Sequence, residues 1–243
     1  MNPSSARTVL VTGASRGIGR VVARHLASQS VHCLLLARNA GALEDLSREI
    51  REAGGRADVI QCDLARLENP EALTALLSRH TTRLDGVLLN AALGGPRLPL
   101  TDYPTDLWRQ VFQVNVHATQ LLLAAVHPFL LESPAGRVVF VSTGVAQNWK
   151  ANTGAYAASK AAVEAIAGIY AQETADTTIR SNILSPGATR TEMRAEAYPD
   201  EDPGLLKTPA SIAPLFAELL STDCLLHGAL VKADQWLEPR QRT

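Results

Sequence analysis

Short apolar runs alternate with longer amphipathic segments along nearly the whole chain. In seven short runs apolar residues follow one another instead of alternating with polar residues, which is typical of strands buried on both faces of a sheet. They lie at residues 8–12, 32–37, 57–61, 86–90, 137–142, 179–184 and 229–232. The segments between them predict helices at residues 17–28, 40–53, 70–80, 105–131, 155–175 and 209–220. This order predicts a single α/β domain over residues 1–243, a doubly wound parallel sheet of seven strands with helices on both faces.

Composition narrows the classes of protein that fit this pattern. Hydrophobic residues make up 46% of the chain and charged residues 19%, which suits a globular domain and excludes a disordered one. Three cysteines, odd in number and far apart, favour reduced thiols in a cytoplasmic protein. Residues 110–131 are uncharged but hold too many polar groups for hydrocarbon, so they predict a buried helix. The histidines lack metal-ligand spacing and no aromatic residues interleave with the arginines, so we expect no metal and no nucleic acid.

Positive charge is concentrated at the start of the chain. The whole chain has a net charge of -1, but residues 1–43 contain no acid. Their five arginines are Arg7, Arg16, Arg20, Arg24 and Arg38. This asymmetry predicts an anionic ligand near the N-terminal segment.

One long irregular stretch, residues 186–208, is rich in proline, glycine and charge. Because such loops are uncommon inside compact domains, we expect a functional lid, with the substrate loop at about residues 187–208. Residues 1–7 and 235–243 are expected to be polar tails.

A glycine-rich turn joins the first strand to the first helix. In VLVTGASRGIG the glycines are Gly13, Gly17 and Gly19. Such glycines let the backbone approach a pyrophosphate, and the following helix N-terminus offers amides and a positive dipole end. The turn predicts a Rossmann-type dinucleotide site. Its spacing, G-x-x-x-G-x-G, differs from the usual G-x-G-x-x-G, so a plain strand–helix turn is the alternative.

The same residues satisfy the nucleophile elbow G-x-S-x-G of α/β-hydrolases, with Ser15 as the nucleophile and His227 as a late histidine. An elbow needs an oxyanion-hole loop from an earlier strand, and only fourteen residues precede Ser15. Position therefore disfavours the hydrolase interpretation.

The residues after the second strand indicate which dinucleotide is bound. An acid there would bind the ribose 2′-hydroxyl of NAD, but the strand ends in Arg38-Asn39 and no acid precedes Glu44. An arginine at this place accommodates the 2′-phosphate of NADP, and Arg16 is placed to assist. We therefore expect NADP(H) to be preferred over NAD(H); the alternative is that Arg38 is only a solvated arginine at a strand end.

Residues suited to catalysis follow in the second half of the chain. Tyr156 and Lys160 lie at i and i+4 on one helix face, and a nearby cation lowers the pKa of a tyrosine. Ser142 ends the fifth strand, and open α/β sheets bind ligands at the carboxyl ends of strands. Asn115 lies in an otherwise apolar helix, where it must be hydrogen-bonded; a satisfied core amide is the alternative.

In this order, TGASRGIG, Asn90, Asn115, Ser142, YAASK and LSPGATRTEM resemble the short-chain dehydrogenase/reductase family over about residues 7–232. KANTGAYAASK and TRTEMRAEAYPDEDP are similar to a little-characterised bacterial branch. The resemblance implies that Tyr156 is the general acid that protonates a carbonyl oxygen and that Ser142 hydrogen-bonds the same oxygen. It implies that Lys160 binds the nicotinamide ribose and lowers the Tyr156 pKa. Asn115 would hold a water that links Lys160 to a proton relay.

The resemblance also implies contacts to the cofactor. Asp63 would contact the adenine amino group, and residues 90–92 would pass close to the adenosine ribose. The segment after the sixth strand would close over the nicotinamide and diphosphate. The full expected cofactor set is Gly13, Ser15, Arg16, Gly17, Ile18, Gly19, Arg38, Asn39, Asp63, Leu64, Asn90, Ala91, Ala92, Tyr156, Lys160, Pro186, Gly187, Thr189 and Thr191.

Two places depart from the family pattern. The usual N-N-A-G after the fourth strand reads Asn90-Ala91-Ala92-Leu93, so the local turn and its support of Asn115 are expected to differ. The last strand ends in VKADQW rather than in an Asp-Gly-Gly run, so the packing at a subunit contact is expected to differ.

Together these features predict an NADPH-dependent oxidoreductase that reduces a ketone, aldehyde or 3-oxoacyl carbonyl to an alcohol. We expect a small-molecule substrate, no nucleic-acid or membrane partner, and a homodimer or homotetramer as in relatives of the family. The alternative is a non-catalytic NADP-binding sensor or partner-binding protein on the same fold. Its expected signature is a broken catalytic set, whereas all four residues are present in this sequence.

Overall fold

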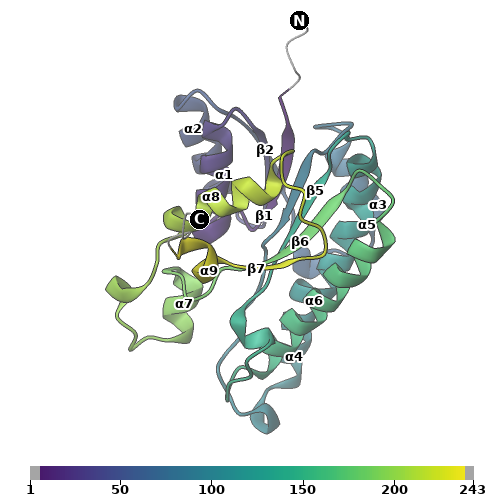
Figure 1. Ribbon diagram of the computed structural model, residues 1–243. Coiled ribbons are helices and arrows are strands. Elements are labelled where there is room, and N and C mark those ends of the chain that lie inside the picture. The colour runs from purple at the N-terminus through teal and green to yellow at the C-terminus, as the bar shows by residue number, and fades with distance from the viewer. Residues whose placement is uncertain (1–5, 239–243) are drawn as a thin grey trace, which may run out of the picture.

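The computed structural model describes residues 6–238, and within them seven strands form one parallel sheet (Figure 1). The strands are β1 (Thr8–Thr12), β2 (His32–Ala37), β3 (Arg56–Gln61), β4 (Gly86–Leu89), β5 (Arg137–Val141), β6 (Arg180–Ser185) and β7 (Leu230–Lys232). Their order is β3-β2-β1-β4-β5-β6-β7. The predicted fold is confirmed. The direction of the strand order reverses between β1 and β4, the kind of place where open α/β sheets bind ligands.

Helices cover both faces of the sheet (Figure 1). On one face lie α1 (Gly17–Ser28), α2 (Ala40–Glu52) and α8 (Pro209–Leu220); on the other lie α3 (Pro70–Leu77), α5 (Ala118–Leu131) and α6 (Gly154–Glu173). Successive side chains of a strand point to opposite faces. In β1, Val9 and Val11 therefore join the first layer and Leu10 joins the second. Two buried faces require apolar residues at every strand position, which is the pattern seen in the sequence.

The long helix predicted at residues 105–131 is interrupted in its middle. It consists of α4 (Thr105–Phe112), a π-helical turn at Gln113–His117, and α5. Among the described residues, Thr105–Leu131 alone is long and apolar enough to cross a membrane by length and composition, a test that core helices of soluble proteins also pass. In its most apolar window, 56% of the residues are buried inside the protein. Single-turn π segments often occur at functional sites, which directs attention to this turn.

Two short helices were not predicted. The irregular stretch after β6 contains α7 (Glu192–Ala197), whose N-cap, Thr191, accepts a hydrogen bond from the Arg194 amide at 3.1 Å. The segment expected to be a C-terminal tail, residues 235–243, overlaps the end of α9 (Ala233–Leu237). The rest of the expected tails, residues 1–5 and 239–243, lie outside the described residues.

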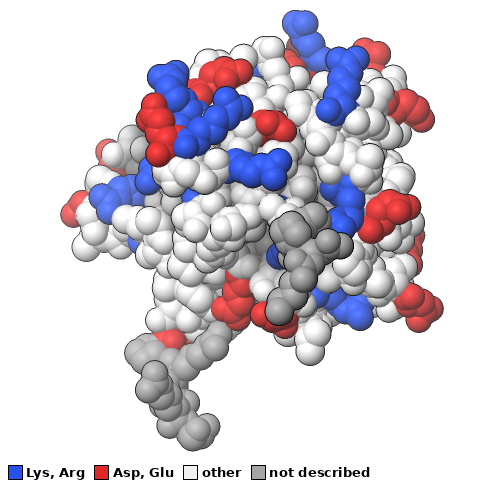
Figure 2. Space-filling model, turned by 90° about the horizontal axis from the view of Figure 1, so that it is seen from above, with Lys and Arg blue, Asp and Glu red and all other residues white. Residues whose placement is uncertain are grey.

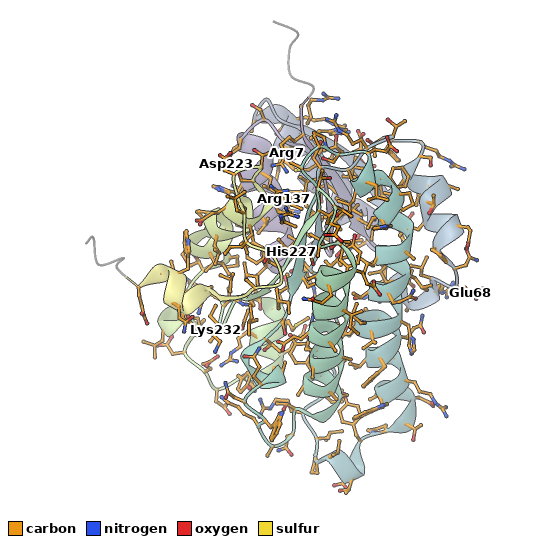
Figure 3. The ribbon with its side chains drawn as sticks, turned by 45° about the vertical axis from the view of Figure 1, so that its right-hand side comes forward. Arg7, Glu68, Arg137, Asp223, His227 and Lys232 are labelled. Carbon is orange, nitrogen blue, oxygen red and sulfur yellow. The ribbon has the colours of Figure 1, made fainter. Side chains whose placement is uncertain are left out.

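Charged side chains at the amino ends of the strands stabilise the structure. Arg137 is buried and donates to the carbonyl oxygens of Ser221 at 3.0 Å and Thr222 at 2.7 Å. Arg7 and Asp223 lie near it (Figure 3). Elsewhere on the surface, Figure 2 shows basic and acidic side chains interspersed on the face seen from above.

Candidate active site

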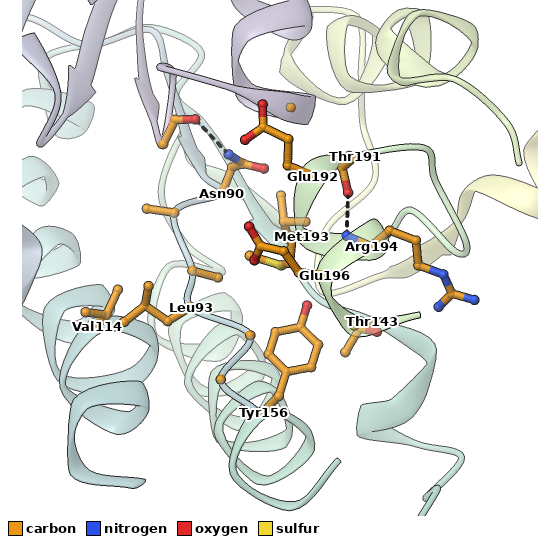
Figure 4. Close-up of a pocket in the computed structure, with 18 of the residues that line it drawn as sticks. Asn90, Leu93, Val114, Thr143, Tyr156, Thr191, Glu192, Met193, Arg194 and Glu196 are labelled. Atoms are coloured by element: carbon orange, nitrogen blue, oxygen red, sulfur yellow. Dashed lines mark hydrogen bonds between the residues drawn. The ribbon is translucent and has the colours of Figure 1, made fainter. Parts of the chain in front are cut away.

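A cavity of about 810 Å³ lies at the carboxyl ends of the strands (Figure 4). The glycine turn, the segments that follow β2, β3, β4 and β5, the start of α6 and residues 186–199 line it. Every residue predicted for the site lines this cavity except Gly19, Asn39 and Asn115. The structure therefore brings together side chains that are far apart in the sequence.

The glycine turn is shaped by close backbone contacts. Gly13 has a φ of +66°, and a Cβ there would lie 3.0 Å from the Cα of Ala91. Gly19 packs so closely that a Cβ would overlap the Gly13 carbonyl oxygen, which explains its need for glycine although it does not face the cavity. Asn90 fixes the turn from β4, since its Nδ2 donates to the Thr12 carbonyl oxygen at 3.0 Å.

The N-terminus of α1 fits a phosphate group. The N-cap residue of α1, Arg16, makes no capping hydrogen bond with its side chain, whereas Asn39 caps α2 through the Ala42 amide at 3.1 Å. Uncapped amides at a helix N-terminus bind anions. Asn39 thus caps the helix that follows it, and its predicted contact to the cofactor stays a prediction. Ser15 and Ile18 line the cavity beside these amides.

The end of the cavity nearest β2 and β3 holds the residues predicted for the adenosine half. Arg38 is exposed, lines the cavity, and has no ion pair among residues 6–238. Asp63 accepts a hydrogen bond from the Ala65 amide at 3.1 Å and so caps a short 3₁₀ turn, with Leu64 beside it on the cavity wall. A positively charged, solvent-facing Arg38 suits a phosphate at this end.

Arg16 contacts acids of α7 across the cavity. Its Nη1 lies 2.7 Å from Glu192 Oε2 and 3.6 Å from Glu196 Oε1, and all three residues line the cavity. Pro186, Gly187, Thr189 and Thr191 line it as well, so the segment after β6 lies against the glycine turn as predicted from the sequence. The Glu192 and Glu196 carboxylates partly neutralise the charge of Arg16. Of the two arginines that line the cavity near the glycine turn and β2, Arg38 is therefore the less neutralised.

Tyr156 presents its phenol to the cavity from the first turn of α6 (Figure 4). Burial raises its pKa to about 12, and a hydrogen bond from the Thr143 side chain acts in the opposite direction. The sequence predicts a lowered pKa because of Lys160, and this expectation is wrong in direction, since desolvation outweighs the other effects. A phenol with a raised pKa stays protonated near neutral pH and can donate a proton.

Thr143, rather than Ser142, lies beside this phenol. The Ser142 hydroxyl donates to Glu164 Oε1 at 2.5 Å, and Gln147 Nε2 donates to the same oxygen at 2.8 Å. In this structure the Ser142 hydroxyl is engaged with a carboxylate of α6, and the role predicted for Ser142 stays a prediction. Two neighbouring hydroxyls end β5, and Glu164 takes one of them.

Lys160 lies four residues after Tyr156 on α6 and is buried, with 3% of its surface exposed. Its Nζ donates to the Val141 carbonyl oxygen at 2.7 Å. Burial lowers its pKa to about 8, and the nearby Glu164 carboxylate acts in the opposite direction. An amino group that titrates near pH 8 is charged at neutral pH and loses its charge in mild alkali.

Asn115 lies in the π-helical turn and does not face the cavity. Its Oδ1 accepts from the Leu93 amide at 2.7 Å, and its Nδ2 donates to the Leu93 carbonyl oxygen and to Ser159 Oγ, both at 2.9 Å. Its side chain thus ties the loop after β4 to α6. These hydrogen bonds form although Leu93 stands where the family usually has glycine, because Asn115 contacts only backbone atoms of Leu93.

The histidine of the alternative hydrolase interpretation is engaged elsewhere. His227 Nε2 lies 2.7 Å from the Ala171 carbonyl oxygen, and its Nδ1 accepts from the Ser181 amide at 3.2 Å. Its contact with Ala171 lies near the C-terminal end of α6, whereas Tyr156 lies in the first turn, and His227 does not line the cavity that contains Ser15. Ser15 therefore has no histidine partner of the kind a hydrolase needs.

Sequence reasoning missed several residues of this site. Glu164 lies four residues after Lys160, so its place on the same helix face could have been found from the spacing YAASKAAVE. Thr143 could not be distinguished from Ser142 by spacing alone. Arg97 and Tyr198 come from two loops, and no local pattern announces their contact.

Comparison with known proteins gives consistent matches. The short chain dehydrogenase family matches residues 7–202. The chain is 43% identical over 223 residues to the uncharacterized oxidoreductase YciK of Escherichia coli (strain K12), over 89% of this chain and 87% of that protein. It is 30% identical over 199 residues to dehydrogenase/reductase SDR family member 4 of Bos taurus, over 82% of this chain and 71% of that protein.

Two similar solved structures contain a dinucleotide. A short chain dehydrogenase of Shigella flexneri 2a, complexed with NADP, superimposes with a TM-score of 0.90 at 40% identity, covering 94% of this chain and 97% of its own. One from Escherichia coli CFT073, complexed with NADPH, gives a TM-score of 0.90 at 41% identity, covering 93% and 96%.

Proposed function

The chain belongs to the short-chain dehydrogenase/reductase family, and we propose that it is an NADPH-dependent reductase that converts a carbonyl compound to an alcohol. The observation that carries this proposal is the protonated Tyr156 phenol, hydrogen-bonded by Thr143 and close to Lys160, in the same cavity as the glycine turn.

Three features support NADP(H) as the cofactor. The glycine turn and the uncapped N-terminus of α1 suit a diphosphate. Arg38 suits the 2′-phosphate, and the Shigella and Escherichia coli structures contain NADP and NADPH. When bound, NADPH supplies a hydride to the carbonyl carbon.

The residues of the chain would then manage the proton. Tyr156 would donate its phenolic proton to the carbonyl oxygen, and Thr143 would donate a hydrogen bond to the same oxygen. A proton from solvent would restore the phenol. The balanced reaction consumes a carbonyl compound, NADPH and one proton and yields an alcohol and NADP⁺.

The direct test is NADPH oxidation across a panel of ketones, aldehydes and 3-oxoacyl thioesters, with NADPH binding measured in parallel. Reduction of any member with formation of the alcohol supports the proposal. Binding of NADPH without turnover of any member would favour the non-catalytic NADP-binding alternative instead.

Removing the Thr143 hydroxyl should lower kcat/KM by about tenfold to a hundredfold. Thr143→Val keeps the shape but deletes the donor to the reacting oxygen, and a hydrogen bond to a charged group contributes about 1.5–3 kcal/mol. Thr143→Ser should keep most of the activity. Steady-state rates for the two variants and for Ser142→Ala check this prediction. A larger loss in Ser142→Ala than in Thr143→Val would reverse the assignment of the hydroxyl.

The catalytic efficiency, kcat/KM for NADPH, should also fall above about pH 8. The ammonium form of Lys160 is the form suited to bind a ribose hydroxyl; it is present below the pKa of about 8 and is lost as the pH rises through it. The pH dependence of kcat/KM for NADPH reports the ionisable groups of the free enzyme. On the alkaline side of the pH profile, kcat/KM should therefore drop about tenfold per pH unit. Tyr156, with a pKa of about 12, stays protonated throughout.

Initial rates of carbonyl reduction between pH 7 and 10 measure this decrease. Lys160→Met should have a lower kcat/KM and should not show the decrease above about pH 8. A wild-type profile that stays flat over the whole range would show that Lys160 does not titrate there.

A further inference from the structure

Arg97 is a cation of the cavity without an acidic partner. It lies on the connection between β4 and α4 and lines the cavity. Within residues 6–238 no carboxylate lies within 4.0 Å of it, its Nη2 reaches only the Ala151 carbonyl oxygen at 3.5 Å, and its Nη1 is shielded from solvent without a hydrogen-bond partner. A buried N–H group without an acceptor costs free energy, so native proteins rarely keep one without a reason.

An aromatic ring places Arg97 close to the catalytic phenol. The guanidinium carbon of Arg97 lies 4.2 Å from the centroid of the Tyr198 ring. Tyr198 in turn lies near enough to Tyr156 to raise the pKa of the Tyr156 phenol. Arg97, Tyr198 and Tyr156 all line the same cavity, so the guanidinium and the proton donor face one space.

Three other charged residues of the cavity wall, Arg194, Glu192 and Glu196, already lie against partners of opposite charge. Arg194 also stacks on Tyr198, at 3.7 Å, but Glu201 binds its guanidinium through two contacts of 2.6 Å, and its side chain turns away from Tyr156 (Figure 4). Glu192 and Glu196 lie against Arg16 at the glycine turn. At the substrate end, an unmatched positive charge remains at Arg97.

The wall around this charge is largely apolar. Leu93, Val114, Val145 and Met193 line the same cavity as Tyr156. Such a wall suits an apolar substrate body, and a planar guanidinium suits an anionic oxygen group at its end.

On the basis of the proposed reductase function, we propose that Arg97 forms an anion subsite and that the substrate is a carbonyl compound carrying a carboxylate or phosphate a few atoms from the reacting carbonyl. Carbonyl reduction leaves the anionic group unchanged, so the product is the corresponding hydroxy acid or hydroxyalkyl phosphate.

Matched substrates test this subsite. Wild-type protein with NADPH is assayed on 4-oxopentanoate and its methyl ester, and on dihydroxyacetone phosphate and dihydroxyacetone. We expect kcat/KM for at least one anionic member to exceed that of its neutral partner about tenfold, with the advantage shrinking as salt is added. The pair that shows the advantage identifies carboxylate or phosphate as the group bound. Equal efficiency within both pairs overturns the proposal while leaving the reductase function intact.

Variants locate the effect at Arg97. Arg97→Met keeps an apolar stem on Tyr198 and removes the charge, and its loss on the anionic member should exceed its loss on the neutral member about tenfold. Arg97→Lys should restore part of the difference. Arg109→Gln is the control, since it removes a charge from a side chain of α4 that is 75% exposed. It should change kcat/KM on neither the anionic nor the neutral substrate. Equal losses on both members in Arg97→Met would show a structural role and overturn the subsite.

A binding measurement separates this proposal from the proposed function. The rise in melting temperature caused by 4-oxopentanoate or dihydroxyacetone phosphate is recorded with NADP⁺ present, for wild type and Arg97→Met. A rise that requires Arg97, without any NADPH oxidation, would support the subsite and contradict the reductase function. No Arg97-dependent rise with either anion overturns the subsite, whatever turnover shows.

Discussion

Replacing Tyr156 with phenylalanine is expected to lower turnover by about 10²-fold or more and to leave NADPH binding nearly unchanged. The substitution keeps the ring on the cavity wall and removes the proton that the carbonyl oxygen would accept. General acid catalysis of this kind contributes about 10²- to 10⁴-fold. Because the phenol has a pKa raised to about 12, it carries its proton at neutral pH, and solvent would have to supply that proton in the variant.

The loss should appear in kcat rather than in the dissociation constant of NADPH, since the interaction removed is made in the transition state. Steady-state kinetics and a fluorescence titration with NADPH measure the two quantities. Tyr103→Phe is a matched control, because Tyr103 is also a partly buried tyrosine but does not line the cavity. Wild-type turnover in Tyr156→Phe on any verified substrate would refute the proposed proton donor.

The parallel sheet could be predicted because its physics is local to each segment. Strands covered on both faces must be apolar at every position, and β1 and β2 were predicted with the bounds the structure shows. The bounds of α1 and α8 were also predicted as the structure shows them, whereas other helices differ at their ends. The bounds of α6, Gly154–Glu173, begin one residue before and end two residues before the predicted range 155–175.

The π-helical turn in the helix of residues 105–131 could not be predicted, because its cause lies in another part of the chain. Asn115 bonds to the backbone of Leu93 and to Ser159, and these partners lie 22 and 44 residues away. The sequence did show that Asn115, as a polar side chain in an apolar helix, must find partners. It could not show that the helix adopts π geometry where Asn115 meets them.

The catalytic hydroxyl illustrates a second limit. Ser142 and Thr143 are adjacent at the end of β5, and spacing from Tyr156 separates them by one residue. In the structure Glu164 accepts a hydrogen bond from Ser142, and for this reason we propose Thr143 as the hydroxyl that serves the reacting oxygen. The Tyr156 pKa was misjudged for a related reason. Sequence showed the charged neighbour, Lys160, but not the burial that opposes it.

Reversing the charge of Arg38 is expected to change the ratio of the NADPH and NADH dissociation constants by about 10²-fold or more. A partly exposed charge-assisted contact to the 2′-phosphate contributes roughly 1.5–3 kcal/mol, or about one to two decades of affinity. Arg38→Asp removes that attraction and adds a repulsion. Arg16 could compensate only in part, since Glu192 and Glu196 lie against its guanidinium. The aspartate would also accept hydrogen bonds from the 2′-hydroxyl of NADH, so NADH affinity should hold or rise.

Titration of both dinucleotides into wild type, Arg38→Asp and Arg24→Asp decides the matter. Arg24 belongs to the same acid-free segment and is exposed on α1, but it does not line the cavity with Arg38. Its reversal changes the net charge by the same amount and should leave the ratio within about twofold, since exposed charges more than a Debye length apart are largely screened at physiological salt. A similar drop in NADPH affinity in both variants would mean that only the overall charge matters. If the wild-type protein already binds NADH more tightly, the 2′-phosphate is not recognised at Arg38 and the NADP(H) assignment fails without any variant.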